Sequence, residues 1–415
     1  MRLRSERGRL QGIVMGGCLA TMAMAPNVRA EEAQPPPADM PPPPPSAAAA
    51  PAPAAPPEPA PQPAPVPAMA APPPAVPPAV PLERMPAKIN TSFGLRAAGQ
   101  VQGSSDTSKL NDIGLGTLYL EAHFGGALDK YFAWEARFNA DLLDGNSLGP
   151  TGTAAVMDLI LKFEPVDELR VWAGRLLVPS DRSNFSGPFY MSPWNYPGGY
   201  GATFVGPRTG PTGRDDGAVV WGNILEGKGK YFLGVFNLEN KQQSPLYSGR
   251  VNIALLGTEP GFWGNSTYYG GKDIVAIGGG FQYQKDGSGL PAAPTNLKLV
   301  LGDLLAEKTL PGAGTFSLEG TYYHFDDGQP VKQAYYVLGS FLTADYIGVG
   351  KLQPLFRWQQ ASPQGGGPKW NIIDAFVTYV IHDFDLKVAL GYQRIDFGSG
   401  TTASNAIQLG VQMQE

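Results

Sequence analysis

The sequence contains little cysteine, little histidine and little charge. Its 415 residues include one cysteine, Cys18, and three histidines, His123, His324 and His382. A single cysteine excludes an internal disulfide and any zinc site built from several thiolates. The histidines are far apart in the sequence, and none has another ligand residue beside it at a metal-binding spacing. We therefore predict no disulfide, no metal site and no cofactor.

Charged residues make up 16% of the chain, below the roughly 25% of an average soluble domain. The net charge of -5 gives no reason to expect a nucleic-acid partner. No Walker lysine loop occurs. The glycine run 278–280 is better explained by relief of crowding or a bulge in a strand than by phosphate binding. We predict that the protein is not an enzyme.

The first thirty residues have the pattern of a secretory signal peptide. A basic start is followed by the mostly apolar run 10–25, and Val28-Arg29-Ala30 offers a cleavage site before Glu31. The basic residues are Arg2, Arg4, Arg7 and Arg9. An uncleaved membrane anchor is an alternative, although the apolar run is short and rich in glycine. A lipoprotein modified at Cys18 is another, with Met15 as a poor match to the required pattern.

A proline- and alanine-rich segment follows, at residues 31–86. Between residues 34 and 81 nearly every residue is proline or alanine, a composition that favours extended polyproline II geometry at about 3.1 Å per residue. We expect this segment to lie in the periplasm. It acts either as a passive spacer or as a tether that contacts the cell wall.

From residue 87 to residue 415 the sequence pattern changes to short segments of alternating apolar and polar residues. The clearest segment is 130–142, in which Phe132, Trp134 and Phe138 fall on one face and Glu135 and Arg137 on the other. Charges of both signs along one face of a long strand suit a water-filled lumen, with the apolar face toward lipid. No apolar run after residue 87 reaches about 18 residues, so no transmembrane helix is expected.

These segments predict an all-β protein: a transmembrane antiparallel β-barrel of about sixteen strands. The expected strands are 89–102, 114–124, 130–142, 154–164, 168–177, 214–225, 229–239, 248–256, 272–284, 296–305, 313–325, 332–343, 349–360, 370–382, 384–397 and 404–413. An even number of strands places both termini on the periplasmic side. Short turns near 164–168 and 381–384 are then periplasmic, and longer connections are extracellular.

The connection from residue 178 to residue 213 is the longest. It is rich in glycine, proline and aromatic residues, and a connection of this length in a compact barrel is usually functional or disordered. We expect it to fold into the lumen, where Asp181, Arg182 and Arg208 would line a constriction. The alternative is a surface loop that shapes only the mouth of the barrel.

Charged residues on the polar faces of the strands are candidates for the pore lining. Strand parity assigns to the lumen the basic residues Arg96, Arg137, Arg170, Arg250, Arg357 and Arg394. Acidic counterparts are Glu121, Glu135, Asp158 and Glu319. Arginines in a pore attract anions, because the guanidinium group matches phosphate and carboxylate oxygens. The alternative is that each arginine only pairs with a nearby carboxylate.

Several short motifs are similar to those of a known family. The segments 171–179 (VWAGRLLVP), 234–237 (GVFN), 352–358 (LQPLFRW) and 379–388 resemble, in order and spacing, motifs of the phosphate-selective porin O/P family. The resemblance covers about residues 86 to 415. It implies a sixteen-stranded barrel, usually a homotrimer, whose third extracellular loop folds inward. It also implies passive diffusion of small hydrophilic solutes, with Arg175 and Arg357 at wall positions of the conduit. The barrel region is acidic overall rather than basic, so the sign of ion selectivity stays open.

We therefore predict a porin of the bacterial outer membrane, surrounded by lipid, that carries small hydrophilic solutes or ions; anions such as phosphate are candidates. One alternative is a structural barrel that the proline-rich segment tethers toward the cell wall. Another is a soluble secreted all-β protein.

Overall fold

The computed structural model describes residues 89–104, 110–141, 153–197, 213–237, 244–290, 293–326, 328–398 and 402–415. The expected signal peptide (1–30), the proline-rich segment (31–86) and Arg208 lie outside the described residues, so these predictions stay predictions.

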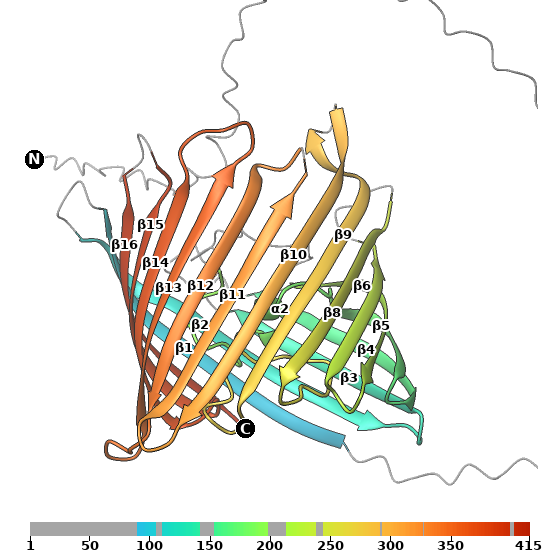
Figure 1. Ribbon diagram of the computed structural model, residues 1–415, viewed down its shortest axis with the longest axis horizontal. Coiled ribbons are helices and arrows are strands. Elements are labelled where there is room, and N and C mark those ends of the chain that lie inside the picture. Colours follow the sequence, from blue (N-terminus) through green and yellow to red (C-terminus); the bar gives the residue numbers. More distant parts are fainter. Residues whose placement is uncertain are drawn as a thin grey trace, which may run out of the picture. The chain divides into compact units, whose positions relative to one another are not determined.

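Sixteen antiparallel strands form a closed barrel in which each strand pairs with its neighbours in sequence and β1 pairs with β16 (Figure 1). The strands are β1 (Ile89–Ser104), β2 (Leu110–Ala127), β3 (Phe132–Asp141), β4 (Thr153–Val166), β5 (Leu169–Leu177), β6 (Arg214–Ile224), β7 (Gly229–Phe236), β8 (Leu246–Leu256), β9 (Ile274–Leu290), β10 (Ala293–Leu310), β11 (Gly314–Phe325), β12 (Val331–Thr343), β13 (Lys351–Pro363), β14 (Trp370–His382), β15 (Leu386–Asp396) and β16 (Ser404–Gln414). The predicted fold class is confirmed.

Alternation along the strands separates an apolar outer face from a polar inner face. In β3, Phe132 and Phe138 are exposed on the outside, whereas Glu135 and Asn139 are buried on the inside. The same period of two runs through β13, where Phe356 and Trp358 face outward and Gln353 and Arg357 face inward. Side chains of a strand point alternately to opposite faces, so this pattern fixes which residues meet lipid.

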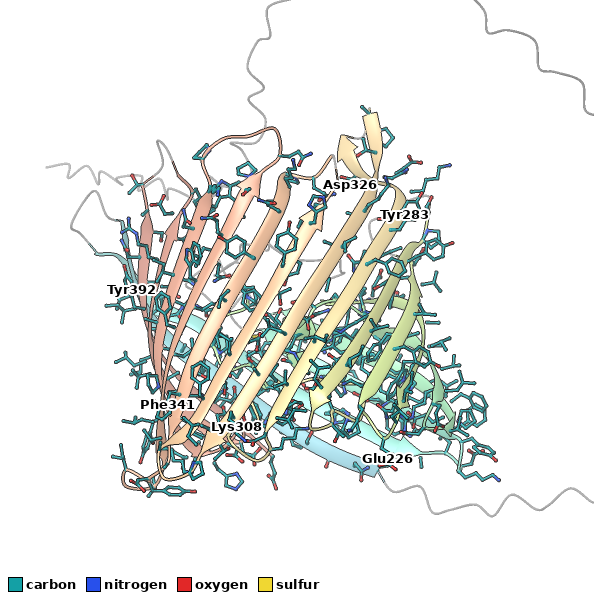
Figure 2. The ribbon with its side chains drawn as sticks, in the orientation of Figure 1. Glu226, Tyr283, Lys308, Asp326, Phe341 and Tyr392 are labelled. Atoms are coloured by element: carbon teal, nitrogen blue, oxygen red, sulfur yellow. The ribbon has the colours of Figure 1, made fainter. Side chains whose placement is uncertain are left out.

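Two lysines on β10 mark the limits of the apolar outer band. Lys298 and Lys308 are exposed, and the outward positions between them include Val300 and Leu304. Ten residues at ~3.3 Å each, tilted by ~45°, span roughly 23 Å, close to the ~25 Å apolar band of outer-membrane barrels. Aromatic side chains lie near both edges: Figure 2 shows Tyr283 and Tyr392 toward one end of the barrel and Phe341, like Lys308, toward the other.

The largest difference from the predicted strands is the hairpin of β9 and β10. We predicted strands 272–284 and 296–305, but β9 continues to Leu290 and β10 runs from Ala293 to Leu310. Lys285, Asp286 and Gly287 have the composition of a turn, but they form a bulge without ladder partners, and pairing resumes at Ser288 opposite Thr295. The helix α2 (Arg182–Ser186) has five residues. Within the described residues, no helix is long and apolar enough to cross a membrane.

Candidate functional site

Two connections enter the barrel interior from opposite ends. We call the end at which β1 begins and β16 ends the terminus end. The loop 178–213 joins β5 to β6 at the opposite end, and its helix α2 lies within the ring of strands (Figure 1). The segment 257–273 joins β8 to β9 at the terminus end. Connections at that end are usually tight turns in outer-membrane barrels, so this inserted segment is unusual.

The wall holds residues 178–197, the part of the loop 178–213 that the structure describes before residue 213, by hydrogen bonds to their main chain. Four inward side chains on four different strands donate to its carbonyl oxygens, over distances of 2.8–2.9 Å. The pairs are Arg96 to Trp194, Arg357 to Asn195, Lys387 to Met191 and Gln412 to Phe189. These donors come from β13, β15, β16 and β1, which lie within five consecutive strands of the closed barrel, so they hold the loop against that side of the wall.

Glycines on the inner wall leave room for the aromatic side chains of this loop. A Cβ atom on Gly94 would lie 2.5 Å from the Phe189 ring, and one on Gly410 would lie 2.5 Å from the Trp194 ring. Carbon atoms do not approach this closely, so both rings need glycine beneath them. The loop therefore packs directly against the backbone of β1 and β16.

An aromatic cluster fills the interior beside β5, β6 and β7. Phe262 of the segment 257–273 stacks on Trp172, with ring centroids 4.4 Å apart, and contacts Trp221 and Phe232. Phe185 of α2 joins the same cluster, 5.5 Å from Phe262. Burial of these rings removes apolar surface from water, and this favours the inward position of both connections.

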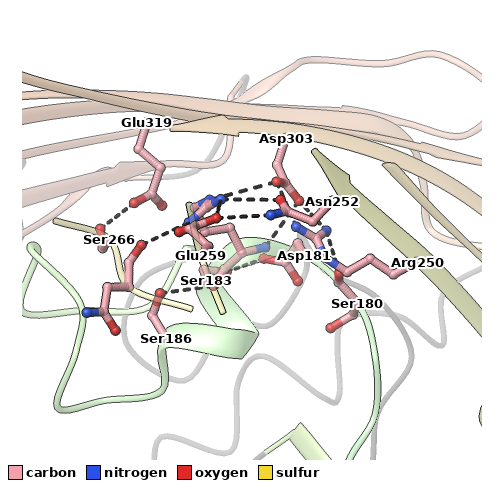
Figure 3. Close-up of polar contacts among 12 residues, drawn as sticks. Ser180, Asp181, Ser183, Ser186, Arg250, Asn252, Glu259, Ser266, Asp303 and Glu319 are labelled. Atoms are coloured by element: carbon pink, nitrogen blue, oxygen red, sulfur yellow. Dashed lines mark hydrogen bonds and ion pairs between the residues drawn. The ribbon is translucent and has the colours of Figure 1, made fainter. Parts of the chain in front are cut away.

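An ion pair joins the two inserted connections where they meet. The Arg182 guanidinium donates to both carboxylate oxygens of Glu259, each at 2.8 Å, and to the carbonyl of Asn265 at 3.1 Å. Burial opposes ionisation of Glu259, but the adjacent Arg182 holds the pKa of this carboxyl well below its usual range. Figure 3 shows Glu259 among the polar contacts that surround Asp303 and Asn252.

A second buried pair lies on the adjoining wall. Arg250 of β8 contacts both oxygens of Asp303 on β10 and also donates to the carbonyl of Ser180 at 2.8 Å. Asp181 accepts hydrogen bonds from Ser183 and, at 2.9 Å, from the Tyr323 hydroxyl. Burial raises the pKa of Asp181, and these donors act against that effect.

Two wall carboxylates anchor the segment 257–273. Glu307 accepts from the Thr267 hydroxyl at 2.6 Å and from the backbone N–H groups of Tyr268 and Gly270. Glu319 accepts from Ser266 and, at 2.7 Å, from the Tyr336 hydroxyl. The segment is thus held by hydrogen bonds to charged acceptors on β10 and β11, which are stronger than neutral ones.

Most of the predicted pore residues point into the barrel. Asp181 and Arg182 are buried in the interior, as described above. The inward strand residues are Arg96, Arg137, Arg170, Arg250 and Arg357. Each has an acidic, carbonyl or aromatic neighbour; Arg357, for example, donates to Asp374 at 2.9 Å.

Arg175 and Arg394 do not follow the expectation, because both lie on the outer face. Arg175 pairs in register with the exposed Leu159 and Asp216, and its guanidinium lies 3.3 Å from the Asp216 carboxylate. Its neighbours Trp172 and Leu176 occupy the inner face, where the aromatic cluster buries them. Arg394 shares the outer face with Tyr392 and donates to Asn405.

Sequence reasoning missed the segment 257–273 with its Glu259, and the wall carboxylates Asp303 and Glu307. A signal was present: fifteen residues separate the predicted strands 248–256 and 272–284 at an end where tight turns are expected. Four aromatic residues, Phe262, Trp263, Tyr268 and Tyr269, lie within that gap. Within the described residues, no group of three or more Asp, Glu, His or Cys side chains is arranged to hold a metal ion.

No protein-family model matches the sequence, and no curated protein is similar to it in sequence. Solved structures are similar in fold. OmpF of Salmonella typhi, solved in complex with daunomycin, aligns with a TM-score of 0.53 and 13% identity over 79% of this chain and 98% of its own. A loop-deleted OmpT, an outer membrane protein of Vibrio cholerae, aligns with a TM-score of 0.52 and 15% identity over 79% and 99%.

A mutant form of the Rh. blastica porin aligns with a TM-score of 0.50 and 12% identity, over 79% of this chain and all of its own. This is the barrel fold of porins. At these levels of identity the comparison establishes the fold and not the solute.

Proposed function

We propose that the protein is an outer-membrane porin that lets small hydrophilic solutes and ions diffuse passively through its lumen. One observation carries the proposal: a closed barrel with an apolar outer band, a charged interior and two inserted connections that narrow the interior. An apolar band places the strands in lipid, and a charged inner wall makes a water path across it. In this proposal the terminus end faces the periplasm and the barrel assembles as a homotrimer.

The solute is the finer part of the proposal. The resemblance to phosphate-selective porins makes phosphate the first anion to test. The inward arginines Arg182, Arg250 and Arg357 are each engaged by a carboxylate. When each arginine is paired with a carboxylate, the two charges largely cancel, and the electrostatic field that would attract anions is weak. We therefore propose a general path for small ions with weak charge selection at neutral pH.

Conductance in planar lipid bilayers tests this function. Purified, detergent-refolded barrel should produce stepwise current increases in a potassium chloride solution, and the reversal potential in a salt gradient should give a permeability ratio close to one. Phosphate added at one side should carry current without blocking chloride. Folded barrel that inserts into the bilayer and gives no current steps would disprove the proposal.

A further inference from the structure

One side of the barrel wall is built from short strands. β5 has 9 residues and β7 has 8, whereas β9 has 17 and β10 has 18. Figure 1 shows β6 and β8 ending lower than β9 and β10. Eight residues at ~3.3 Å each, tilted by ~45°, span roughly 19 Å, less than the ~25 Å apolar band of outer-membrane barrels. We call β5, β6 and β7 the low wall.

The outer face of the low wall contains an ion pair between Arg175 of β5 and Asp216 of β6. The two residues are in register, and the guanidinium Nη1 lies 3.3 Å from a carboxylate oxygen. Arg175 is six residues beyond Leu169, the first residue of β5 at the terminus end. The same strand geometry places it about 14 Å from that end, near the middle of a ~25 Å band. The outward charges of β10, Lys298 and Lys308, lie instead at the two limits of the band.

Lipid chains are a poor environment for this ion pair. The Asp216 side chain keeps 63% of its surface exposed, and the Arg175 side chain keeps 19%. A charged group that faces lipid near the middle of the band destabilises an outer-membrane barrel, because the group loses its hydration there. The exposed carboxylate can accept further hydrogen bonds. A protein surface at this depth can supply the donors, whereas lipid chains cannot.

The surface around the ion pair allows close contact with another barrel wall. Ala173 and Ala218 pair in register, each two residues from the ion pair along its strand, so their small side chains lie on the same outer face. Larger apolar side chains with 41% to 59% of their surface exposed flank them on β4 and β7; they are Leu159, Leu161, Leu233 and Val235. A central arginine surrounded by contacts that exclude water is a frequent arrangement in protein interfaces.

We propose that the low wall is the surface at which copies of this chain contact one another, with the Arg175–Asp216 pair at its centre. This inference rests on the homotrimer of the proposed function and names the surface that forms it. Copies that insert in the same orientation form a closed ring whose symmetry axis lies along the membrane normal. Each residue then lies at the same depth in every copy. Arg175 of one copy therefore meets Asp216 of the next, and a patch with one acid and one base is complementary to itself.

The oligomeric state of the protein in a mild detergent tests this surface, measured by size-exclusion chromatography with light scattering. Wild-type protein should elute as a trimer. Asp216→Lys places two cations at each contact, and the dissociation constant between subunits should rise about tenfold or more. Asp396→Lys is the matched control, because it reverses a carboxylate beside another exposed arginine, Arg394 of β15. The control should leave the dissociation constant unchanged.

Thiol cross-linking in membranes tests the contact without changing the ion pair. In a Cys18→Ser background, Ala218→Cys should form covalent dimers and trimers with a short bifunctional thiol reagent. Ala306→Cys is the matched control and should form neither, because Ala306 lies on the outer face of β10, two residues from Leu304 and from Lys308. Cross-linking of position 218 to a different protein, no product at position 218, or equal yields at both positions would overturn this inference.

Conductance in planar bilayers separates this inference from the proposed function. A wild-type barrel that is monomeric and conducts would overturn the low wall as a contact surface and leave the porin function standing. Equal dissociation constants for Asp216→Lys and Asp396→Lys would do the same. A trimer that cross-links through position 218 and inserts without conducting would overturn the porin function and leave the contact surface standing.

Discussion

At the scale of single residues, the interior depends on close fits between small wall residues and the charged groups next to them. The glycine run 278–280 shows this most clearly. A Cβ on Gly278 would lie 2.3 Å from the Arg250 guanidinium and 2.5 Å from the Asp303 carboxylate. Relief of crowding, one of the two sequence interpretations of this run, is therefore confirmed, and the crowding comes from a buried ion pair.

We predict that Gly278→Val destabilises the barrel by about 1–3 kcal/mol, because the new side chain must displace the Arg250–Asp303 pair. Unfolding by denaturant in detergent micelles, followed by tryptophan fluorescence, measures this difference. Gly279→Val is the matched control: the nearest atom to its Cβ would be 3.9 Å away, an ordinary contact. Equal stability losses in the two variants would show that the fit around the ion pair is not the cause.

The two misplaced arginines also have residue-scale explanations. A sequence shows which residues of a strand face the lumen only where one face of the strand is apolar and the other is polar. In β5 both faces carry apolar residues, because Trp172 and Leu176 pack on the inserted connections inside while Leu169 faces outward. Arg394 lies beyond Tyr392 near the end of β15, where an outward charge can leave the apolar band. The sequence does not distinguish these cases from a lumen position.

At the scale of elements, the sixteen strands were predictable and the path of the connections was only partly so. Each of the sixteen predicted strands overlaps a strand of the barrel, and the length of the loop 178–213 indicated an inserted connection. The helix α2 of this loop contacts the segment 257–273 through the ion pair of Arg182 with Glu259. These two residues are 77 positions apart in the sequence. No short-range pattern in the sequence predicts a contact between residues so far apart.

We predict that replacing the segment 257–273 by a tight turn raises the single-channel conductance, because the segment occupies part of the lumen. A matched control shortens the turn between β12 and β13. That turn is at the same end, and its Ile347 carbonyl is bound by Tyr379 at 2.5 Å, on the exposed side of the barrel. Conductance in planar bilayers is the measurement. If both deletions leave it unchanged, the segment does not limit the ion path.

At the scale of the whole molecule, the apolar outer band decides where the barrel resides. Between Lys298 and Lys308, β10 presents only uncharged residues outward. Closure of β1 onto β16 leaves no unpaired strand edge, as a membrane-spanning sheet requires. These two properties together give the barrel a lipid-facing surface and a separate interior.

We predict that Leu304→Arg costs about 2–4 kcal/mol of stability in a bilayer, because it places a charge near the middle of the band. Leu310→Arg, at the end of the same strand and past Lys308, should cost only about 0–1 kcal/mol. Folding into lipid vesicles under a urea gradient measures both. Similar costs for the two variants would mean that the lysines do not mark the edge of the band.

The order of residues was enough to predict the barrel: a period of two with one apolar face recurs in most of the sixteen predicted strands, and such a repeat favours a closed sheet between lipid and water. The sequence also predicted most of the arginines that face the barrel interior, because the same period of two decides which face of a strand each residue occupies. What fills the interior could be learned only from the folded chain. The inserted segment 257–273 and the Arg182–Glu259 pair arise from contacts between residues distant in sequence, and such contacts depend on how the closed wall brings the connections together.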